Sequence, residues 1–180
     1  MTASTKIAKR AAQLLSLEGK IAVVTGAGSG IGRGICLRLA EMGAYIAALD
    51  IDQGKARETV ALLDNRASSK YAAQLTAKSA KASRSSRRTA HLQARAIALR
   101  CDVRVTANCR SAVANTVQEW GRIDILCNCA GIAIRKDIVE LTEEEWDRAL
   151  DVTLKGIYLL SHEVIPHMIR DGGGSIINIG

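Results

Sequence analysis

Glycine occupies every second position in the run TGAGSGIG, which begins at Thr25 and ends at Gly32. A backbone without side chains can turn tightly and come close to a phosphate, and the start of a helix adds N–H donors and the positive end of its dipole. The run follows a β-branched apolar segment and precedes a helical pattern, which is the context that a dinucleotide-binding bend requires. We therefore expect residues 25–32 to bind the pyrophosphate of a dinucleotide.

An acidic residue follows at the distance expected for the ribose-binding group of such a site. Asp50 ends a second apolar run, 24 residues after Gly26. A carboxylate at this place accepts hydrogen bonds from the ribose hydroxyls and repels a 2′-phosphate. Neither Ser29 nor Ile51 is basic, so the pattern predicts NAD rather than NADP. The alternative interpretation of Asp50 is an ordinary turn residue at a strand end.

The elements that position these residues alternate along the chain. Apolar, β-branched runs predict strands, and runs with helical periodicity lie between them. Such alternation indicates an α/β protein with a doubly wound parallel sheet of the Rossmann type, with strand order 3-2-1-4-5. The expected strands are residues 20–26, 44–50, 94–103, 122–131 and 175–179, and the expected helices are residues 31–43, 52–63, 106–121 and 142–171.

The last of these helices begins with a clear start signal. Thr142 as N-cap and Glu145 three residues later form a capping box. Further along the helix, four apolar residues fall on one stripe: Trp146, Leu150, Ile157 and Val164.

The net charge of +7 comes from one segment. Residues 65–91 hold seven of the 25 Lys and Arg residues and none of the 18 acids, so the rest of the chain is balanced. This segment has few large apolar residues, which predicts a basic, flexible or weakly helical insertion in the domain. A loop that binds polyanions is an alternative, but no aromatic interleaving or known motif indicates nucleic acid. Translated unspliced or misassembled sequence would also fit its position and composition.

The cysteines and the N-terminus bear on the compartment. The five cysteines have no disulfide-framework spacing; Cys127 and Cys129 could chelate a metal, but no second pair completes a site, so no metal is expected. Buried thiols in a reducing compartment, the cytoplasm, fit better.

Residues 1–17 form an N-terminal extension, either a helical lead-in or a transit peptide, before the domain of residues 18–180. No apolar run is long enough for a membrane span.

Five motifs in order resemble the short-chain dehydrogenase/reductase family. They are T-G-x-x-x-G-I-G in residues 25–32, CDV in residues 101–103, NCAG in residues 128–131, EEEWDRALDVTLKGIYLL in residues 143–160 and GSIINIG in residues 174–180. The resemblance covers Leu17 to Gly180 apart from the insertion. The cofactor-binding residues that it implies are Gly26, Ala27, Gly28, Ser29, Gly30, Ile31, Gly32, Asp50, Ile51, Asp102, Val103, Asn128, Cys129, Ala130 and Gly131.

Three positions depart from the family pattern. Cys129 replaces the second asparagine of the N-N-A-G motif, where backbone contacts to the cofactor need no side chain. Thr153 stands where the family has a catalytic asparagine, whose backbone carbonyl holds a water of the proton relay. The sequence ends at Gly180, one position before the family's catalytic serine and before its Tyr-x-x-x-Lys pair. We therefore expect these 180 residues, truncated after the fifth strand, to bind a dinucleotide weakly and not to turn over.

The resemblance implies an oxidoreductase that transfers hydride between the nicotinamide of NAD and a small-molecule secondary alcohol or ketone. It also implies that the intact protein is a homo-oligomer. The alternative is a non-catalytic dinucleotide-binding or interaction module that uses its basic loop on a polyanion. The substrate itself is not specified by these residues.

Overall fold

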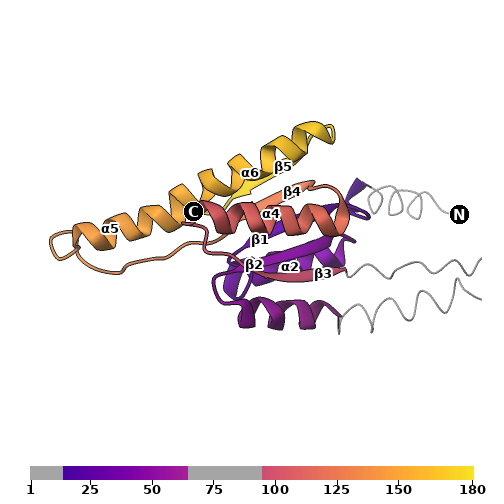
Figure 1. Cartoon of the computed structure of the whole chain (residues 1–180). Helices are drawn as coiled ribbons and strands as arrows, with labels where there is room; N and C mark the ends of the chain where they lie inside the picture. The colour runs from indigo at the N-terminus through magenta and orange to yellow at the C-terminus, as the bar shows by residue number, and fades with distance from the viewer. Residues whose placement is uncertain (1–13, 65–94) are drawn as a thin grey trace, which may run out of the picture.

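The computed structural model describes residues 14–64 and 95–180, which form a parallel sheet flanked by helices (Figure 1). The sheet has five strands in the order β3-β2-β1-β4-β5. This order confirms the doubly wound, Rossmann-type fold expected from the sequence. The strands are β1 (Ile21–Thr25), β2 (Tyr45–Asp50), β3 (Ala96–Arg100), β4 (Ile125–Asn128) and β5 (Ser175–Asn178).

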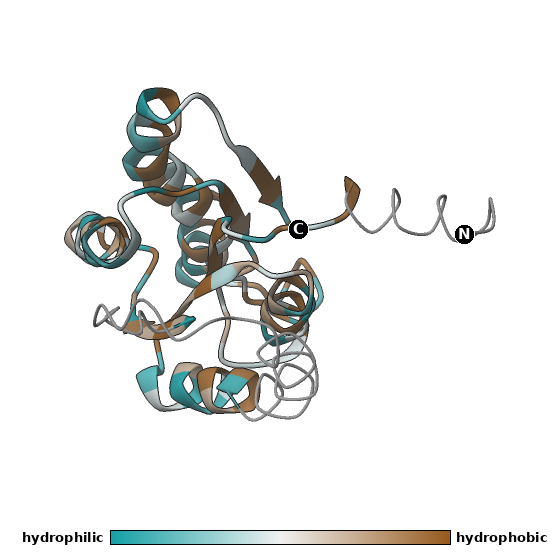
Figure 2. Cartoon of the chain, turned by 90° about the vertical axis from the view of Figure 1, so that its right-hand side faces the viewer, coloured by the Kyte–Doolittle hydropathy of each residue, from teal (hydrophilic) through white to brown (hydrophobic). Residues whose placement is uncertain are grey.

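Helices cover both faces of the sheet, as the view in Figure 2 shows. The helical elements are α2 (Gly30–Glu41), residues 53–64, α4 (Thr106–Trp120), α5 (Glu143–Leu150), the π-helical segment η1 (Asp151–Lys155) and α6 (Gly156–Arg170). Helices α4 and α6 pack on one face of the sheet, and α2 and residues 53–64 pack on the other.

Strand β1 shows why the central strands are continuous apolar runs. All five of its residues are buried, because its side chains point alternately to the two faces of the sheet and a layer of helices covers each face. Val23 packs in the cluster that includes Leu160 and Val164 of α6, whereas Val24 packs in the cluster that includes Cys36 of α2. Because all strands pair in parallel, their carboxyl ends lie together at one edge of this closely packed layer.

The long C-terminal helix differs from its expected form. The capping box is confirmed: Thr142 Oγ1 accepts a hydrogen bond from Glu145 N, and the Glu145 carboxylate accepts one from Thr142 N. Of the four residues of the apolar stripe only Val164 is buried: Trp146 is 50% exposed, Leu150 is 40% exposed and Ile157 is partly buried.

This difference has two structural causes. Helix α5 extends past the edge of the sheet, so that it has no strand beneath it (Figure 1). The π-helical turn of η1 then changes which side chains face inward. From there on, the buried residues recur every four positions: Gly156, Leu160, Val164 and Met168.

Two expectations concern residues that the structure does not describe. The basic insertion at 65–91 and most of the N-terminal extension at 1–17 lie outside the described residues. Leu17, at the end of that extension, is described and packs against the core on the α2 side of the sheet. Within residues 14–64 and 95–180, no helix combines the length and the apolar character needed to cross a membrane.

Candidate dinucleotide-binding site

A cavity of about 440 Å³ opens at the carboxyl ends of the strands. It lies where the chain order of the sheet reverses, between β1 and β4, which is the place where doubly wound sheets bind their ligands. Most residues expected from the sequence line it: Gly26, Ser29, Gly30, Ile31, Gly32, Asp50, Ile51, Asp102, Val103, Cys129, Ala130 and Gly131. Ala27, Gly28 and Asn128 do not line the cavity, but each is next in sequence to a residue that does.

The glycine-rich bend packs so closely on the start of α2 that position 32 has no room for a side chain. A Cβ at Gly32 would lie 2.2 Å from the carbonyl oxygen of Gly26, and Gly26 itself has a φ of 60°. Alanine at position 32 would therefore force the bend away from α2. This close approach brings the start of α2 directly to the cavity wall.

Side chains behind the bend donate the hydrogen bonds that fix it. Thr59 Oγ1 donates to the Ala27 carbonyl at 2.7 Å, and the Arg33 guanidinium donates to the Gly28 carbonyl. Arg33 is in turn held by Thr59 and by Glu58. The carbonyl groups of the bend are thus bound on the side away from the cavity.

The helix N-terminus next to the bend remains uncapped by side chains. Ser29, the N-cap of α2, makes no side-chain capping hydrogen bond. The first N–H groups of a helix have no partner within the helix, and together they favour an anion. Because Ser29, Gly30 and Ile31 line the cavity, the donors and the bare backbone of this segment fit a diphosphate.

Asp50 joins the bend to the end of β2. Its Oδ2 accepts a hydrogen bond from Gly28 N at 2.8 Å, and its Oδ1 accepts one from Asp52 N at 2.9 Å. Both donors are backbone groups, so the carboxylate has a fixed orientation at the cavity wall. The interpretation of Asp50 as a turn residue therefore describes only part of its contacts, because the carboxylate also bonds to the bend.

Thr25 ties β1 to the segment after β4, a role that the sequence motifs did not predict. Its buried Oγ1 accepts hydrogen bonds from Cys129 N at 2.9 Å and from Ala130 N at 3.0 Å. The replacement of asparagine by Cys129 leaves these contacts intact, because they use only the backbone. The sequence signal that could have indicated this role is Thr25 itself, a hydroxyl residue at the end of an otherwise apolar buried strand.

Asn128 fixes the neighbouring strand pair. Its Nδ2 donates to Asn178 Oδ1 at 2.9 Å, from β4 to the directly paired residue of β5. Asn128 is buried, so it acts on the site through the sheet rather than from the cavity wall.

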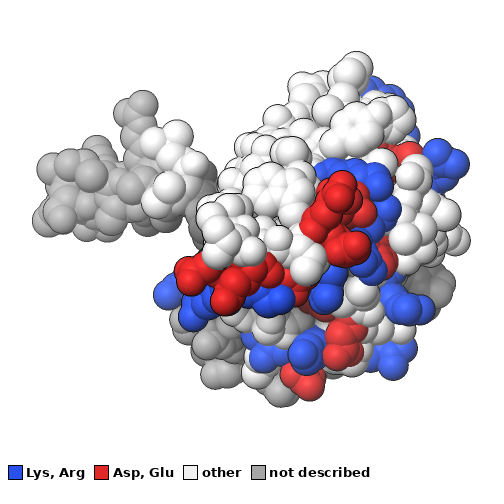
Figure 3. Space-filling view, turned by 90° about the vertical axis from the view of Figure 1, so that its left-hand side faces the viewer, with Lys and Arg blue, Asp and Glu red and all other residues white. Residues whose placement is uncertain are grey.

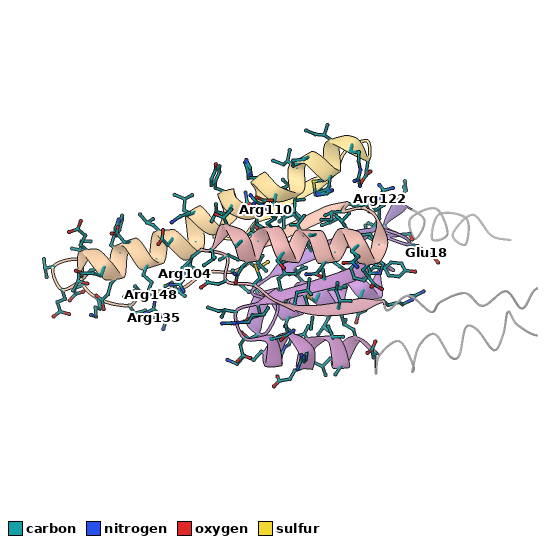
Figure 4. The ribbon with its side chains drawn as sticks, viewed as in Figure 1. Glu18, Arg104, Arg110, Arg122, Arg135 and Arg148 are labelled. Carbon is teal, nitrogen blue, oxygen red and sulfur yellow. The ribbon has the colours of Figure 1, made fainter. Side chains whose placement is uncertain are left out.

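Asp102 is held by an arginine that no sequence motif predicted. Arg104 donates from Nε and from Nη2 to the two oxygens of Asp102, at 2.9 and 2.7 Å. This bidentate pair lowers the pKa of Asp102 below its ordinary value, since it stabilises the carboxylate. Arg104 also lines the cavity, as does Arg148 of α5. Figure 4 shows both residues at the carboxyl ends of the strands.

Thr153 lies beside the cavity, within η1. Its Oγ1 is buried and has no hydrogen-bond partner among the residues that the structure describes. The same oxygen lies 3.6 Å from the position that a Cβ on Gly131 would take. Its neighbour Val152 lines the cavity, so the π-helical turn contributes to the cavity wall together with the glycine-rich bend.

The face that carries the cavity has mixed charge. Figure 3 views this end of the molecule and shows acidic and basic side chains side by side. Over the described ranges, no group of three or more His, Cys, Asp or Glu side chains could hold a metal ion.

Comparisons with known proteins agree with the fold described above. The short chain dehydrogenase family profile matches residues 20–88 and 71–180. The chain is 38% identical over 161 residues to the short-chain reductase protein NovJ of Streptomyces niveus, covering 89% of this chain and 52% of that protein. It is 37% identical over 163 residues to D-threitol dehydrogenase of Mycolicibacterium smegmatis, covering 91% of this chain and 53% of that protein.

A solved structure shows the same likeness in three dimensions. The 3-ketoacyl-(acyl-carrier-protein) reductase of Brucella melitensis, complexed with NADH, matches with a TM-score of 0.69 and 30% sequence identity. That match covers 87% of this chain and 53% of the reductase. The chain belongs to the short-chain dehydrogenase family. It spans about half the length of the curated relatives that it matches.

Proposed function

We propose that this chain forms the dinucleotide-binding part of an NAD-dependent oxidoreductase, which transfers hydride between the nicotinamide and a small-molecule secondary alcohol or ketone. The observation that carries the proposal is the Asp50 carboxylate, fixed by Gly28 N at 2.8 Å beside the uncapped start of α2. An anion-binding helix start and a ribose-binding acid are thereby joined at one wall of one cavity.

The residues of the cavity have distinct roles in this proposal. The N–H groups at the start of α2 bind the diphosphate, and the Asp50 carboxylate accepts hydrogen bonds from the adenosine ribose. Asp102, oriented by Arg104, and Val103 contact the adenine. The backbone of residues 128–131, held by Thr25, lies along the cofactor.

The preference for NAD over NADP follows from charge. A 2′-phosphate next to Asp50 would place like charges together, and Ile51, which follows it at the cavity wall, offers no cation. Arg33, in the first turn of α2, does not line the cavity, and its guanidinium is engaged by Gly28, Thr59 and Glu58. The site therefore favours an adenosine ribose whose 2′-hydroxyl carries no phosphate.

The bound nicotinamide would supply the hydride acceptor or donor. This chain contributes Thr153 beside the cavity, and its hydroxyl, which has no partner among the residues that the structure describes, is placed to hold a water or a ligand hydroxyl. Tyr158 is 62% exposed and is not part of the cavity wall, so it does not take the part of the family's catalytic tyrosine. We propose that these 180 residues bind the dinucleotide without turning over.

Calorimetry on the purified 180-residue chain tests the proposal. NADH and ADP-ribose should both bind, NADPH should bind more weakly, and NAD-dependent oxidation of secondary alcohols should be undetectable. Absence of heat with both NADH and ADP-ribose would overturn the proposed site. Turnover by the same sample would overturn only the statement about catalysis.

Two further expectations are also proposals. The whole protein would be a homo-oligomer, and the exposed apolar side chains of α5, η1 and α6, such as Trp146, Leu154 and Tyr158, offer a surface for it. The cytoplasm is the proposed compartment, and the five cysteines are free thiols. The alternative of a polyanion-binding module depends on residues 65–91, which lie outside the described residues, and no described contact favours it.

A further inference from the structure

The carbonyl group of Gly28 is held by a side chain that lies outside the cavity wall. Arg33 Nη2 donates a hydrogen bond to this carbonyl, and Arg33 does not line the cavity. Arg33 belongs to α2, so its side chain reaches back from the helix to the bend that precedes it. The roles assigned above do not use this contact.

Two residues of the next helix fix the guanidinium group itself. Arg33 Nε donates to the buried Thr59 Oγ1 at 3.0 Å, and Arg33 Nη2 donates to Glu58 Oε2 at 2.9 Å. Thr59 and Glu58 are neighbours in the helix of residues 53–64. Because a guanidinium group is planar and its N–H donors have fixed directions, these two partners and the Gly28 carbonyl together define one orientation for it.

The peptide unit between Gly28 and Ser29 connects this contact to the candidate ligand site. A trans peptide unit is planar, so its C=O and N–H groups point in opposite directions. Arg33 holds the Gly28 carbonyl on the side away from the cavity, and the N–H group of Ser29 therefore points the other way. Since Ser29 lines the cavity, this N–H group becomes a donor for an anion at the start of α2.

The two residues before Ser29 have their N–H groups engaged within the protein. Ala27 N donates to the Leu49 carbonyl at 3.0 Å, and Gly28 N donates to Asp50 Oδ2 at 2.8 Å. The N–H group of Ser29 is thus the next one along the bend that can meet a ligand. If its peptide unit turned over, a carbonyl oxygen would take its place, and the negative end of that dipole would repel a phosphate.

We propose that Arg33 is a positioning residue for the diphosphate of the dinucleotide: it holds the Gly28 carbonyl away from the cavity and so directs the Ser29 N–H group into it. Glu58 and Thr59 support this role by orienting the guanidinium group. The role depends on the planar guanidinium group and not on positive charge alone. The inference rests on the function proposed above, because it assumes that a diphosphate occupies the cavity.

Arg33→Lys separates geometry from charge, because lysine keeps the positive charge but cannot hold several partners at fixed angles. Affinity for ADP, measured by calorimetry, should fall about tenfold, the effect of losing one charge-assisted hydrogen bond. Affinity for adenosine, which carries no phosphate, should stay within about twofold of the parent in ligand-observed NMR. The control is Arg38→Lys, which alters an exposed arginine of the same helix paired with Glu41 and should leave both affinities unchanged.

The sign of a second substitution distinguishes positioning from simple attraction. Glu58→Ala removes a negative charge near the bend, which by itself would help an anion to bind. If Glu58 acts by orienting Arg33, affinity for ADP should instead fall, by about threefold. In the Arg33→Lys background the same substitution should have no further effect, since the two residues act through one contact. A rise in ADP affinity, or no change, in the single variant would overturn the support from Glu58.

Amide NMR on the whole 180-residue chain observes the proposed donor directly. Addition of ADP should shift the Ser29 amide resonance of the parent strongly, and Arg33→Lys should lose most of this shift. The amide resonances of Ala27 and Gly28, whose N–H groups are already bonded, should move less. Arg33 is partly exposed, so the variant should fold, which circular dichroism checks. If it did not fold, Glu58→Ala would decide the question.

Three results would overturn the positioning role. They are ADP binding by Arg33→Lys equal to that of the parent, an equal loss of ADP and adenosine binding in that variant, and an unchanged shift of the Ser29 resonance. A parent chain that binds neither ADP nor NADH would instead overturn the proposed function, and this inference with it, before any variant is made.

Discussion

Asp50 Oδ2 accepts a hydrogen bond from Gly28 N at 2.8 Å, so the carboxylate at the end of β2 is bonded directly to the glycine-rich bend after β1. The acid therefore has a structural role before any ligand is considered. A second backbone donor, Asp52 N, holds the other oxygen at 2.9 Å. The proposed ribose-binding group is consequently fixed in one orientation, which reduces the ordering that ligand binding would require.

The charge of Asp50 should decide the choice between the two dinucleotides. Asp50→Asn keeps an oxygen that can accept from the bend but removes the negative charge. Affinity for NADH should fall by about threefold to tenfold, as expected for loss of a charged hydrogen bond, while affinity for NADPH should rise. Calorimetric titration with both ligands measures the ratio, and an unchanged NADH-to-NADPH ratio would contradict the role of the carboxylate.

The close approach at Gly32 can be tested with a matched pair of substitutions in α2. Gly32→Ala would place a Cβ 2.2 Å from the Gly26 carbonyl oxygen, so the bend must shift and NADH binding should be lost. Gly34→Ala meets nothing within 4 Å, and alanine favours the helix by about 0.5–1 kcal/mol over glycine. Thermal unfolding should therefore show a less stable Gly32→Ala and a more stable Gly34→Ala. Full NADH binding by Gly32→Ala would disprove the tight packing.

Asp124 should make stability depend on acidity. It is buried and accepts hydrogen bonds from Ile21 N, Lys20 and Arg122. Burial alone would raise the pKa of Asp124, but these three donors outweigh it and lower the pKa below the ordinary value of 3.8. The stabilisation is therefore fully present above pH 3.8 and is lost as the pH falls through the lower pKa of the folded state.

Asp124→Asn should accordingly lower the free energy of unfolding at pH 7 by about 1–3 kcal/mol, since it keeps the backbone contact and loses two charged partners. Denaturant titrations of parent and variant should converge as the pH falls below 3.8. The control is Asp171→Asn, which breaks a surface pair with Arg170 and should have a smaller effect. A difference that grows in acid would show that the sign is wrong.

The hydroxyl of Thr153 should cost stability in the absence of a ligand. Its Oγ1 is buried without a partner among the described residues, so Thr153→Val, which has nearly the same shape, should raise the free energy of unfolding by about 1 kcal/mol. Urea denaturation measures the change. A loss of stability in the variant would mean that the hydroxyl has a partner, such as a water held between η1 and Gly131.

The order of elements was predictable from the sequence because each strand and helix has its own periodic signal. The bend at residues 25–32 and the capping box at Thr142 follow from local patterns, and the strand order follows from the rule that such an alternation of elements forms a doubly wound sheet. The exposure of Trp146 and Leu150 did not follow, because a periodic pattern shows that residues share a helix face but not whether anything covers that face.

Contacts that form only in the folded chain account for the other omissions. Arg104 lies two positions from Asp102, yet no sequence pattern indicated that its guanidinium group would donate to both carboxylate oxygens at the cavity wall. Thr25 receives hydrogen bonds from Cys129 and Ala130 only because β1 and β4 are adjacent in the sheet.

The sequence by itself determined the glycine spacing, the acid at position 50 and the alternation of elements, because these depend on backbone freedom and periodicity that are local properties. Tertiary structure decided which groups meet at the cavity: the hydrogen bond from Gly28 to Asp50, the hydrogen bonds from Cys129 and Ala130 to Thr25, and the hydroxyl of Thr153 that has no partner among the described residues. Such contacts depend on how strands are ordered and how helices are seated on them. That arrangement is set by burial of the whole core rather than by any single segment.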